Sequence, residues 1–180
     1  MPAVVRFPRT LVLALLLLAM PATTGCLKDI RDQVTTILFF VDASDSGVVG
    51  EFLQVNIIMT HVTFKPNETG VQPVTVPVAR DFDLVAIHDG GPQRMFEQKI
   101  PYRVYDKVSA GLNVTGAIRR DGAPIEISVP SDNTFETVDK KFRTRLAGDV
   151  AYFFALSVQK NEAGEHFLQL RNAETGARRA

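Results

Sequence analysis

Apolar and polar residues alternate along most of the chain after residue 33, a repeat that is typical of strands with one buried face. Residues 34–41 are β-branched and aromatic on both faces, which predicts a core strand buried on two sides. Residues 52–64 alternate and are predicted to pair with that strand. Residues 71–78 alternate around two prolines, which indicates an edge strand. Residues 82–88 are apolar and short, and we expect a strand there rather than a brief helical turn.

The second half of the chain predicts β-hairpins. Residues 108–119 lead into Arg120-Asp121-Gly122, and residues 123–129 alternate again after that turn. Because Asp and Gly both tolerate positive φ, the two runs predict a tight hairpin. Further strands are predicted at residues 134–146, 150–159 and 166–171.

Turn signals at intervals of roughly 8 to 12 residues predict one all-β domain. We place this domain at residues 34–172. The expected architecture is an antiparallel β-sandwich of about seven to nine strands, with a small barrel as the alternative. Residues 173–180 are polar and are expected to form a flexible tail.

The N-terminal segment differs from the rest, because residues 11–20 are all apolar and follow Arg6 and Arg9. Ten residues are too few to cross a bilayer, so the pattern indicates a secretory signal peptide. Thr23-Thr24-Gly25-Cys26 resembles the bacterial lipobox, whose cysteine receives diacylglycerol before cleavage, although Thr23 stands where the lipobox prefers leucine. The resemblance implies a lipoprotein signal peptide at residues 1–25 and lipid attachment, including palmitate-type acyl chains, at Cys26. Residues 26–33 would then be a tether.

This lipid anchor would hold the chain in the bacterial cell envelope, since several acyl chains on one residue give stable membrane attachment. Leu27, rather than an acidic residue, follows Cys26, which favours the outer membrane if sorting follows the enterobacterial pattern. The alternative is an ordinary signal peptide with an unmodified cysteine near the cleavage site.

Composition narrows the functional classes. The first 25 residues hold two of the 20 basic residues and no acidic one, so the mature chain carries 18 basic and 20 acidic residues. This charge does not indicate a nucleic-acid partner. Tryptophan is absent, which weakens a sugar-binding role based on tryptophan platforms. Cys26 is the single cysteine, so no internal disulfide is expected.

The sequence gives little evidence for a metal site or for catalytic residues. Asp42, Asp45 and Asp89 are predicted in loops and could offer oxygen ligands to calcium, but they lack D-x-D-x-D spacing and more often cap turns. No metal or cofactor is therefore predicted. No G-x-S-x-G nucleophile motif occurs, so we predict a protein without catalytic residues. The histidines lack metal-binding spacing; they are His61, His88 and His166.

Two further features of the sequence are a run of basic residues and a tyrosine that follows a proline. A basic run near a predicted strand could touch anionic headgroups or an acidic polymer, or could be the solvated face of that strand. Tyr105 lies close to Pro101, and we expect its hydroxyl to bond to the backbone, as corner tyrosines of sandwiches do. The basic residues are Lys140, Lys141, Arg143 and Arg145.

Four short segments follow one another as in a family of secreted bacterial and archaeal domains of unassigned function, whose fold is likened to prealbumin (transthyretin). Its motifs are T-D-A-P, V-x-I-x-x-V-x-V, D-L-L-x-L-x-x-G and P-A-G-x-Y. The resemblance implies a prealbumin-like and Ig-like sandwich in the envelope, and it brings no catalytic residues. Ser44 replaces the proline and Arg103 the glycine. The matching segments are residues 41–44 (VDAS), 55–62 (VNIIMTHV), 83–90 (DLVAIHDG) and 101–105 (PYRVY).

These observations predict a lipid-anchored envelope protein that is not an enzyme. It is expected to act as a binding or structural module that presents loops or an edge strand to a protein or glycan partner. A periplasmic carrier of a small ligand or metal ion is the first alternative, and an enzyme with a spatially assembled site is the second. A large closed apolar pocket would favour the carrier. A cluster of histidines and carboxylates with shifted pKa values would favour the enzyme. A solid core with an exposed edge or apolar patch would favour the interaction module.

Overall fold

A computed structural model describes residues 33–43, 47–137, 141–144 and 149–176. The predicted signal peptide, Cys26 and Asp45 lie outside these residues, as does the predicted tether except Gln33. None of the described residues belongs to a helix long and apolar enough to cross a membrane.

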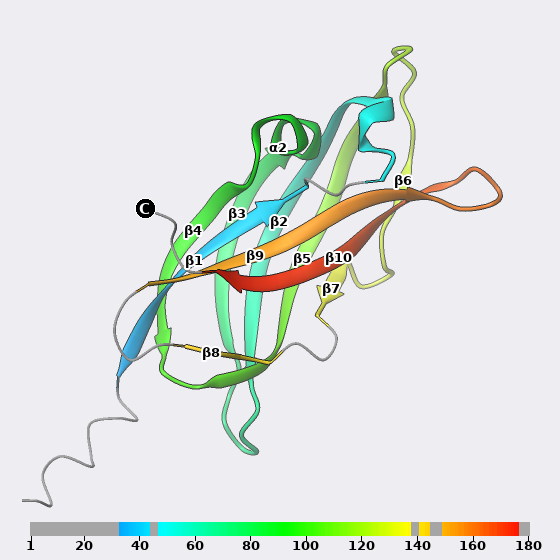
Figure 1. The fold of residues 1–180 in the computed structure, drawn as a ribbon. Helices are drawn as coiled ribbons and strands as arrows, with labels where there is room; N and C mark the ends of the chain where they lie inside the picture. Colours follow the sequence, from blue (N-terminus) through cyan, green and yellow to red (C-terminus); the bar gives the residue numbers. More distant parts are fainter. Residues whose placement is uncertain (1–32, 44–46, 138–140, 145–148, 177–180) are drawn as a thin grey trace, which may run out of the picture. The chain divides into compact units, whose positions relative to one another are not determined.

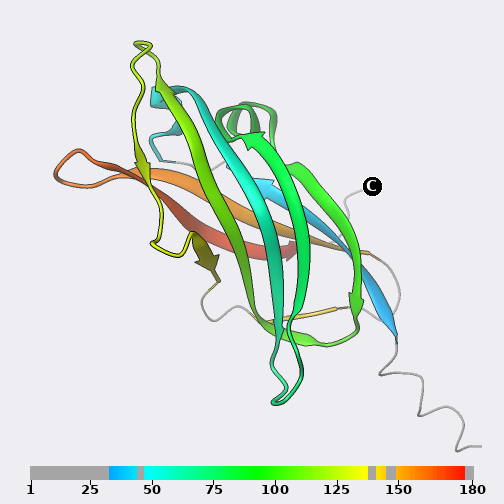
Figure 2. The same cartoon turned by 180° about the vertical axis from the view of Figure 1, so that it is seen from behind.

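The described residues form two packed sheets, mostly of antiparallel strands, which confirms the predicted all-β sandwich (Figure 1). The sheet that we name sheet A has the strand order β4-β1-β9-β10-β6. Sheet B has the order β3-β2-β5-β7, and β8 also pairs with β5 (Figure 2). Sheet A contains β4 (Gln93–Pro101), β1 (Val34–Asp42), β9 (Asp149–Lys160), β10 (His166–Gly176) and β6 (Ile127–Ser128). Sheet B contains β3 (Val74–Asp83), β2 (Phe52–Pro66), β5 (Val104–Arg119), β7 (Thr134–Glu136) and β8 (Phe142–Arg143).

The core lies between the sheets and is rich in aromatic rings. Phe39 of β1 is fully buried and stacks on Phe96 of β4 with a centroid distance of 5.0 Å. Tyr152 and Phe154 of β9 both lie 5.7 Å from the same ring. From sheet B, Phe64 meets Tyr152 edge to face at 6.4 Å. The period-two pattern of the sequence therefore directs large side chains from both sheets into one solid core.

The strand pairing differs from the prediction in two ways. β1 and β2 were predicted to pair, but β1 belongs to sheet A and β2 to sheet B. Two pairings are parallel, β1 with β9 and β6 with β10, although an antiparallel sandwich was expected. Ten strands rather than seven to nine are present in the described residues, because β6, β7 and β8 are short additions to the sheet edges. The proline-containing β3 is an edge strand, as predicted.

Residues 84–90 form the helix α2 (Leu84–Gly90), so the predicted strand at residues 82–88 is wrong beyond Asp83. The Asp83 carboxylate accepts a hydrogen bond from the N–H of Val85 at 3.0 Å, which caps the helix. Gly91 ends it with φ of 88°, a conformation that suits glycine. The helix buries Leu84, Val85 and Ile87, so the apolar residues of this segment are buried as one face of a helix.

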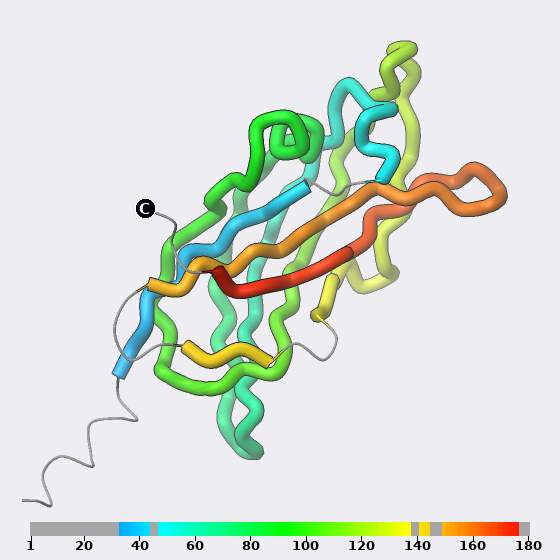
Figure 3. The backbone as a smooth tube through the Cα atoms, in the orientation of Figure 1, coloured from blue at the N-terminus to red at the C-terminus, as the bar shows by residue number. Residues whose placement is uncertain are grey.

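The predicted hairpin after β5 is only partly present. The turn is correct: Gly122 has φ of 84° and donates to the carbonyl of Arg119 at 2.9 Å. The ladder then ends, because the last bond to β5 runs from Ile125 N to Ala117 O at 3.0 Å. The chain leaves sheet B and joins sheet A as β6 beside β10, a path that the tube in Figure 3 follows. Residues 123–129 are therefore not a full partner strand of β5.

The predicted flexible tail is wrong for residues 173–176, because β10 continues to Gly176 and pairs with β9 along this part. The ladder shifts register between Leu170 and Asn172, so Arg171 is the extra residue of a β-bulge.

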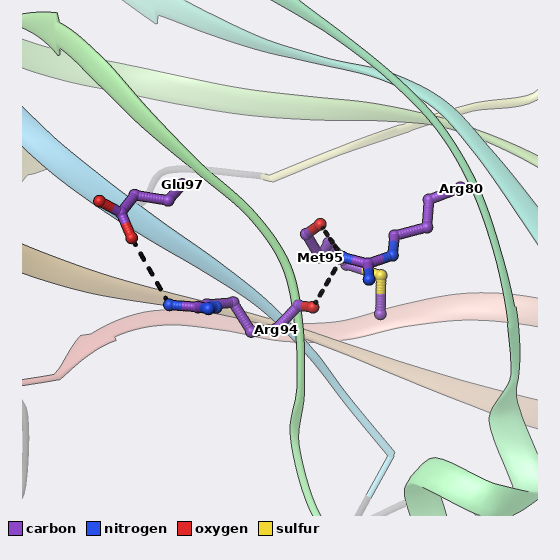
Figure 4. Close-up of polar contacts among 4 residues, drawn as sticks. All are labelled: Arg80, Arg94, Met95 and Glu97. Carbon is purple, nitrogen blue, oxygen red and sulfur yellow. Dashed lines mark hydrogen bonds and ion pairs between the residues drawn. The ribbon is translucent and has the colours of Figure 1, made fainter.

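The side chain of Arg80 joins the sheet edges on one flank of the sandwich. Arg80 of β3 donates from Nη1 to the carbonyl of Arg94 at 3.3 Å and to that of Met95 at 2.5 Å, both in β4 (Figure 4). Arg94 also forms an exposed ion pair with Glu97 at 3.5 Å. The guanidinium thus bonds the edge of sheet B to the edge of sheet A. We call this flank the Arg80 flank.

Candidate functional site

The opposite flank carries an open groove of about 680 Å³. It lies where the chain leaves β5 after the turn and crosses to β6. One wall is β5 at residues 114–116 and the other is the crossing segment at residues 124–129. The lining residues are mostly apolar or small: Val114, Thr115, Gly116, Pro124, Ile125, Glu126, Ile127, Ser128 and Val129.

The β5 wall of the groove includes a stretch of free sheet edge. β7 pairs with β5 at residues 109–111, and Leu112 N donates to Asn133 O at 2.9 Å. On the far side of the groove, pairing resumes at Ala117 and Ile118 with the crossing segment. Between these points residues 113–116 pair with β2 on one side and, within the described chain, with no strand on the other. Thr115 is the extra residue of a bulge there.

A second hollow of about 330 Å³ adjoins the groove. The two share Ile125, Glu126 and Ser128 in their linings. The second hollow, which we name the His166 pocket, is completed by residues of the β9–β10 turn and the start of β10. These are Gly164, Glu165 and His166.

His166 is the least satisfied polar side chain of this region. The residue is 5% exposed, and neither Nδ1 nor Nε2 makes a hydrogen bond to any described atom. Nε2 lies 3.8 Å from Oε2 of Glu51, and the ring packs edge-on against Phe52 at a centroid distance of 5.3 Å. A buried imidazole without a hydrogen-bond partner is uncommon, because its polar atoms lose their water on folding.

Sheet A has a longer free edge, but it differs in character. β6 pairs with β10 only at His166 and Phe167, and no other strand of the described structure pairs with β10 on that side. This edge contains the bulge at Arg171 and the charged, exposed Glu174. Bulges and charges are the features by which proteins protect free edges from pairing. The groove edge of β5 also has a bulge, at Thr115, but it is shorter and contains no charged residue.

Of the three candidate calcium ligands, Asp45 lies outside the described residues, and the other two are in regular secondary structure. Asp42 ends β1 instead of lying in a loop, and Asp89 is exposed in α2. His61 lies in β2, while His88 Nδ1 is 3.0 Å from the carbonyl of Ala43. Across the described ranges, no group of three or more His, Cys, Asp or Glu side chains could hold a metal ion.

The basic run and the tyrosine have structural explanations. Lys141 and Arg143 are exposed on either side of buried Phe142, which matches the solvated face of a strand. Lys140 and Arg145 lie outside the described residues. The hydroxyl of Tyr105 donates to the carbonyl of Pro101 at 2.9 Å, as predicted.

Among the described residues, two buried structural tyrosines have clearly shifted pKa values. Burial raises the pKa of Tyr105 to about 12, and the nearby Arg103 guanidinium offsets part of this effect. Burial also raises the pKa of Tyr152, with a smaller opposite effect from the Thr137 side chain. The Tyr152 hydroxyl is buried without a well-formed hydrogen bond to the described residues. Neither tyrosine lines the groove.

The fold defines the class of the protein as an all-β, two-sheet sandwich with a groove on one flank. No family model matches the chain, and no curated protein matches it. A solved structure with some likeness is the NMR structure of a protein from Eubacterium rectale, which is 11% identical. The match covers 83% of this chain and 98% of that chain, with a TM-score of 0.26. Likeness at this level adds nothing to the argument on fold or function.

Proposed function

We propose that this chain is a lipid-anchored envelope protein whose sandwich binds an extended polypeptide segment of a partner protein. The segment would lie in the groove and add a strand to β5. The observation that carries this proposal is the free edge at residues 113–116, which forms part of a groove lined mainly by apolar and small residues.

Strand addition fits the chemistry of both walls. Every second residue of a strand directs its N–H and C=O to the same side, so a free edge offers ready hydrogen-bonding groups to an extended chain. Four residues of extended chain span about 13 Å at roughly 3.3 Å per residue. The apolar side chains that could take alternate side chains of the segment are Val114, Ile125, Ile127 and Val129. The edge and these side chains together select a short, apolar, extended segment.

The alternatives have less support from the described residues. A carrier needs a site that encloses most of its ligand, whereas this groove is open. An enzyme needs titratable groups that converge with shifted pKa values, and the shifted tyrosines lie in the core. Exposed apolar residues also lie at the groove end of sheet B, where Leu53 precedes Gln54, the partner of Ile118. This surface favours a protein partner.

Filling the groove is expected to weaken peptide binding. The probe is a ten-residue peptide that alternates valine and threonine, with a central lysine. We expect it to bind the wild type and to change the amide NMR signals of residues 113–116. Gly116→Leu should weaken binding at least tenfold by titration calorimetry, because a Cβ at Gly116 meets no atom within 4 Å and the new side chain can occupy the groove.

The matched control is Gly90→Leu in α2, where a Cβ also meets no atom within 4 Å. This variant should bind the probe like the wild type. Signal changes confined to other strands, or unchanged affinity in Gly116→Leu, would contradict the proposed groove.

The anchor is tested separately. In a bacterial host, the intact mass of the detergent-extracted wild type should correspond to cleavage before Cys26 plus acyl chains. Cys26→Ser should lose the acyl mass, since a hydroxyl cannot form the thioether to diacylglycerol. Thr24→Ser is the control, and it should keep the acyl mass because the cysteine and the preceding glycine are intact. A wild-type protein without acyl chains would overturn the anchor.

A further inference from the structure

We propose that the outer face of sheet A is the contact surface of a symmetric dimer, in which two copies of this chain pack sheet A against sheet A. This surface lies apart from the groove, and the dimer does not depend on peptide binding. Two features of the face carry the inference. One is a pair of partly exposed phenylalanines on β1 and β9, and the other is a pair of opposite charges on the strands that flank them.

The aromatic pair consists of Phe40 and Phe153, which lie opposite each other in the parallel ladder of β1 and β9. Their chain neighbours Phe39 and Phe154 are fully buried in the core. Because successive side chains of a strand alternate, the aromatic pair points to the outer face, which is turned toward the viewer in Figure 1. The two rings stack at a centroid distance of 5.0 Å and remain partly exposed. The solvated face of a sheet is usually polar, so adjacent aromatic rings here favour a contact surface.

Charges of opposite sign flank the aromatic pair in the same row of the sheet. Arg94 of β4 lies opposite Phe40, and Glu174 of β10 lies opposite Phe153. Directly opposite residues of a ladder point to the same face, so the whole row belongs to the outer face. Both charged residues are exposed. Across four neighbouring strands the row therefore reads basic, aromatic, aromatic, acidic.

A two-fold axis parallel to the strands makes this row complementary to itself. Such an axis, placed between two facing copies of sheet A, keeps the strand direction and reverses the strand order. Arg94 then meets Glu174 of the second copy, and Phe40 meets Phe153 of the second copy, each contact occurring twice. An axis across the strands would place Arg94 on Arg94 and Glu174 on Glu174. Like charges across a contact are unfavourable, so the charges select the parallel arrangement.

The size of the face predicts a weak dimer in free solution. Four strands spaced about 4.8 Å apart and about 30 Å long cover roughly 570 Å² per copy, less than the about 800 Å² of a standard interface. In the parallel arrangement both copies of β1 begin at the same end of the dimer. Lipid anchors at that end would hold both copies on one membrane, where a raised effective concentration favours pairing.

Cross-linking in the bacterial host tests the dimer with the full chain. Ala155 of β9 lies on the outer face, two residues along from Phe153, and is partly exposed. We expect Ala155→Cys to give a cross-linked dimer with a short bismaleimide, because the two copies of this position face each other near the axis. The control is Glu162→Cys, an exposed position in the β9–β10 turn, which should give no dimer. The wild type measures any background from Cys26.

Charge reversal in the Ala155→Cys chain tests the complementarity. Arg94→Glu should lower the cross-linked fraction by about fivefold or more, because both contacts then join like charges. Adding Glu174→Arg to this variant should restore most of the cross-linking, since each contact again joins opposite charges. Glu162→Arg reverses an exposed charge outside the face and should leave the cross-linked fraction unchanged.

Each contrary result has a definite meaning. No cross-link at Ala155→Cys, or an equal one at Glu162→Cys, would overturn the dimer. A cross-linked fraction that Arg94→Glu leaves unchanged would overturn the two-fold arrangement. Self-cross-linking of Arg94→Cys would do the same, because reversal of the strand order keeps the two copies of this position apart. The groove takes no part in these measurements, so the proposed function stands or falls separately.

Discussion

Phe39→Ala is expected to lower the free energy of unfolding by about 3 to 5 kcal/mol, because a large aromatic side chain leaves a cavity in a close-packed core. Phe39 is fully buried in the second strand of sheet A. Its ring stacks on Phe96 with an interplanar angle of 7° and touches rings of β9 on the other side. Removing it takes contacts from both neighbouring strands at once. Urea denaturation of the soluble domain measures the change from the transition midpoint and slope.

The matched control is Phe40→Ala, one residue along the same strand. Phe40 is partly exposed and stacks on Phe153 at 5.0 Å. We expect a smaller loss than for Phe39, since part of this ring already contacts solvent. Equal losses in the two variants would mean that the face of β1 that contains Phe39 does not face the core.

Stability is expected to fall steeply between about pH 10 and 12, because buried tyrosines resist ionisation in the folded protein. The pKa of Tyr105 rises from 10.0 to about 12 on folding, and that of Tyr152 rises as well. In this range the unfolded chain loses the tyrosine protons while the folded protein keeps them. The stabilisation is therefore complete below pH 10 and is lost as the pH rises toward 12. Tyr105 alone accounts for about 2 to 3 kcal/mol, at roughly 1.4 kcal/mol per pKa unit.

Tyr105→Phe separates this effect from general alkaline unfolding. At pH 7 the variant should lose about 1 kcal/mol, because the hydrogen bond to Pro101 is gone. Between pH 10 and 12 its stability should fall less steeply than that of the wild type. Parallel curves for the two proteins would show that Tyr105 ionises in the folded state as it does in the unfolded chain.

The local pattern of the sequence predicts the class of fold but not the partners of the strands. Alternation along residues 52–64 follows directly from burial of one face of β2. Pairing depends on which strands meet after the chain has crossed between sheets. Nothing in the alternation distinguishes a parallel neighbour of β1 from an antiparallel one, so β9 was not predicted beside it. The helix α2 was missed although Asp83 and Gly91 are recognisable helix caps.

The candidate groove could not be predicted for a related reason. Residues 123–129 alternate as a strand does, and the turn at Gly122 suits a hairpin. The ladder with β5 nevertheless ends after Ile125, because β6 pairs with β10. The edges of β5 and β10 thus compete for the same segment, and pairing with β10 leaves the groove beside β5. A local sequence pattern does not show which edge the segment joins. The sequence indicates that His166 is a strand-end residue. Its burial depends on Glu51 and Phe52, which are distant in the sequence but lie beside its ring in the fold.

The bonds from Arg80 to β4 have a consequence for how the sandwich could admit a partner. They bond sheet B to sheet A along the Arg80 flank, where β3 and β4 are both long strands. On the opposite flank, which carries the groove, the strands β6, β7 and β8 contain two or three residues each. Release of β6 or β7 from its sheet would break only a few ladder bonds, because each pairs over two or three residues. Local opening of the native state is easiest where few contacts must break. The groove therefore lies on the flank where edge strands can detach without unfolding the core.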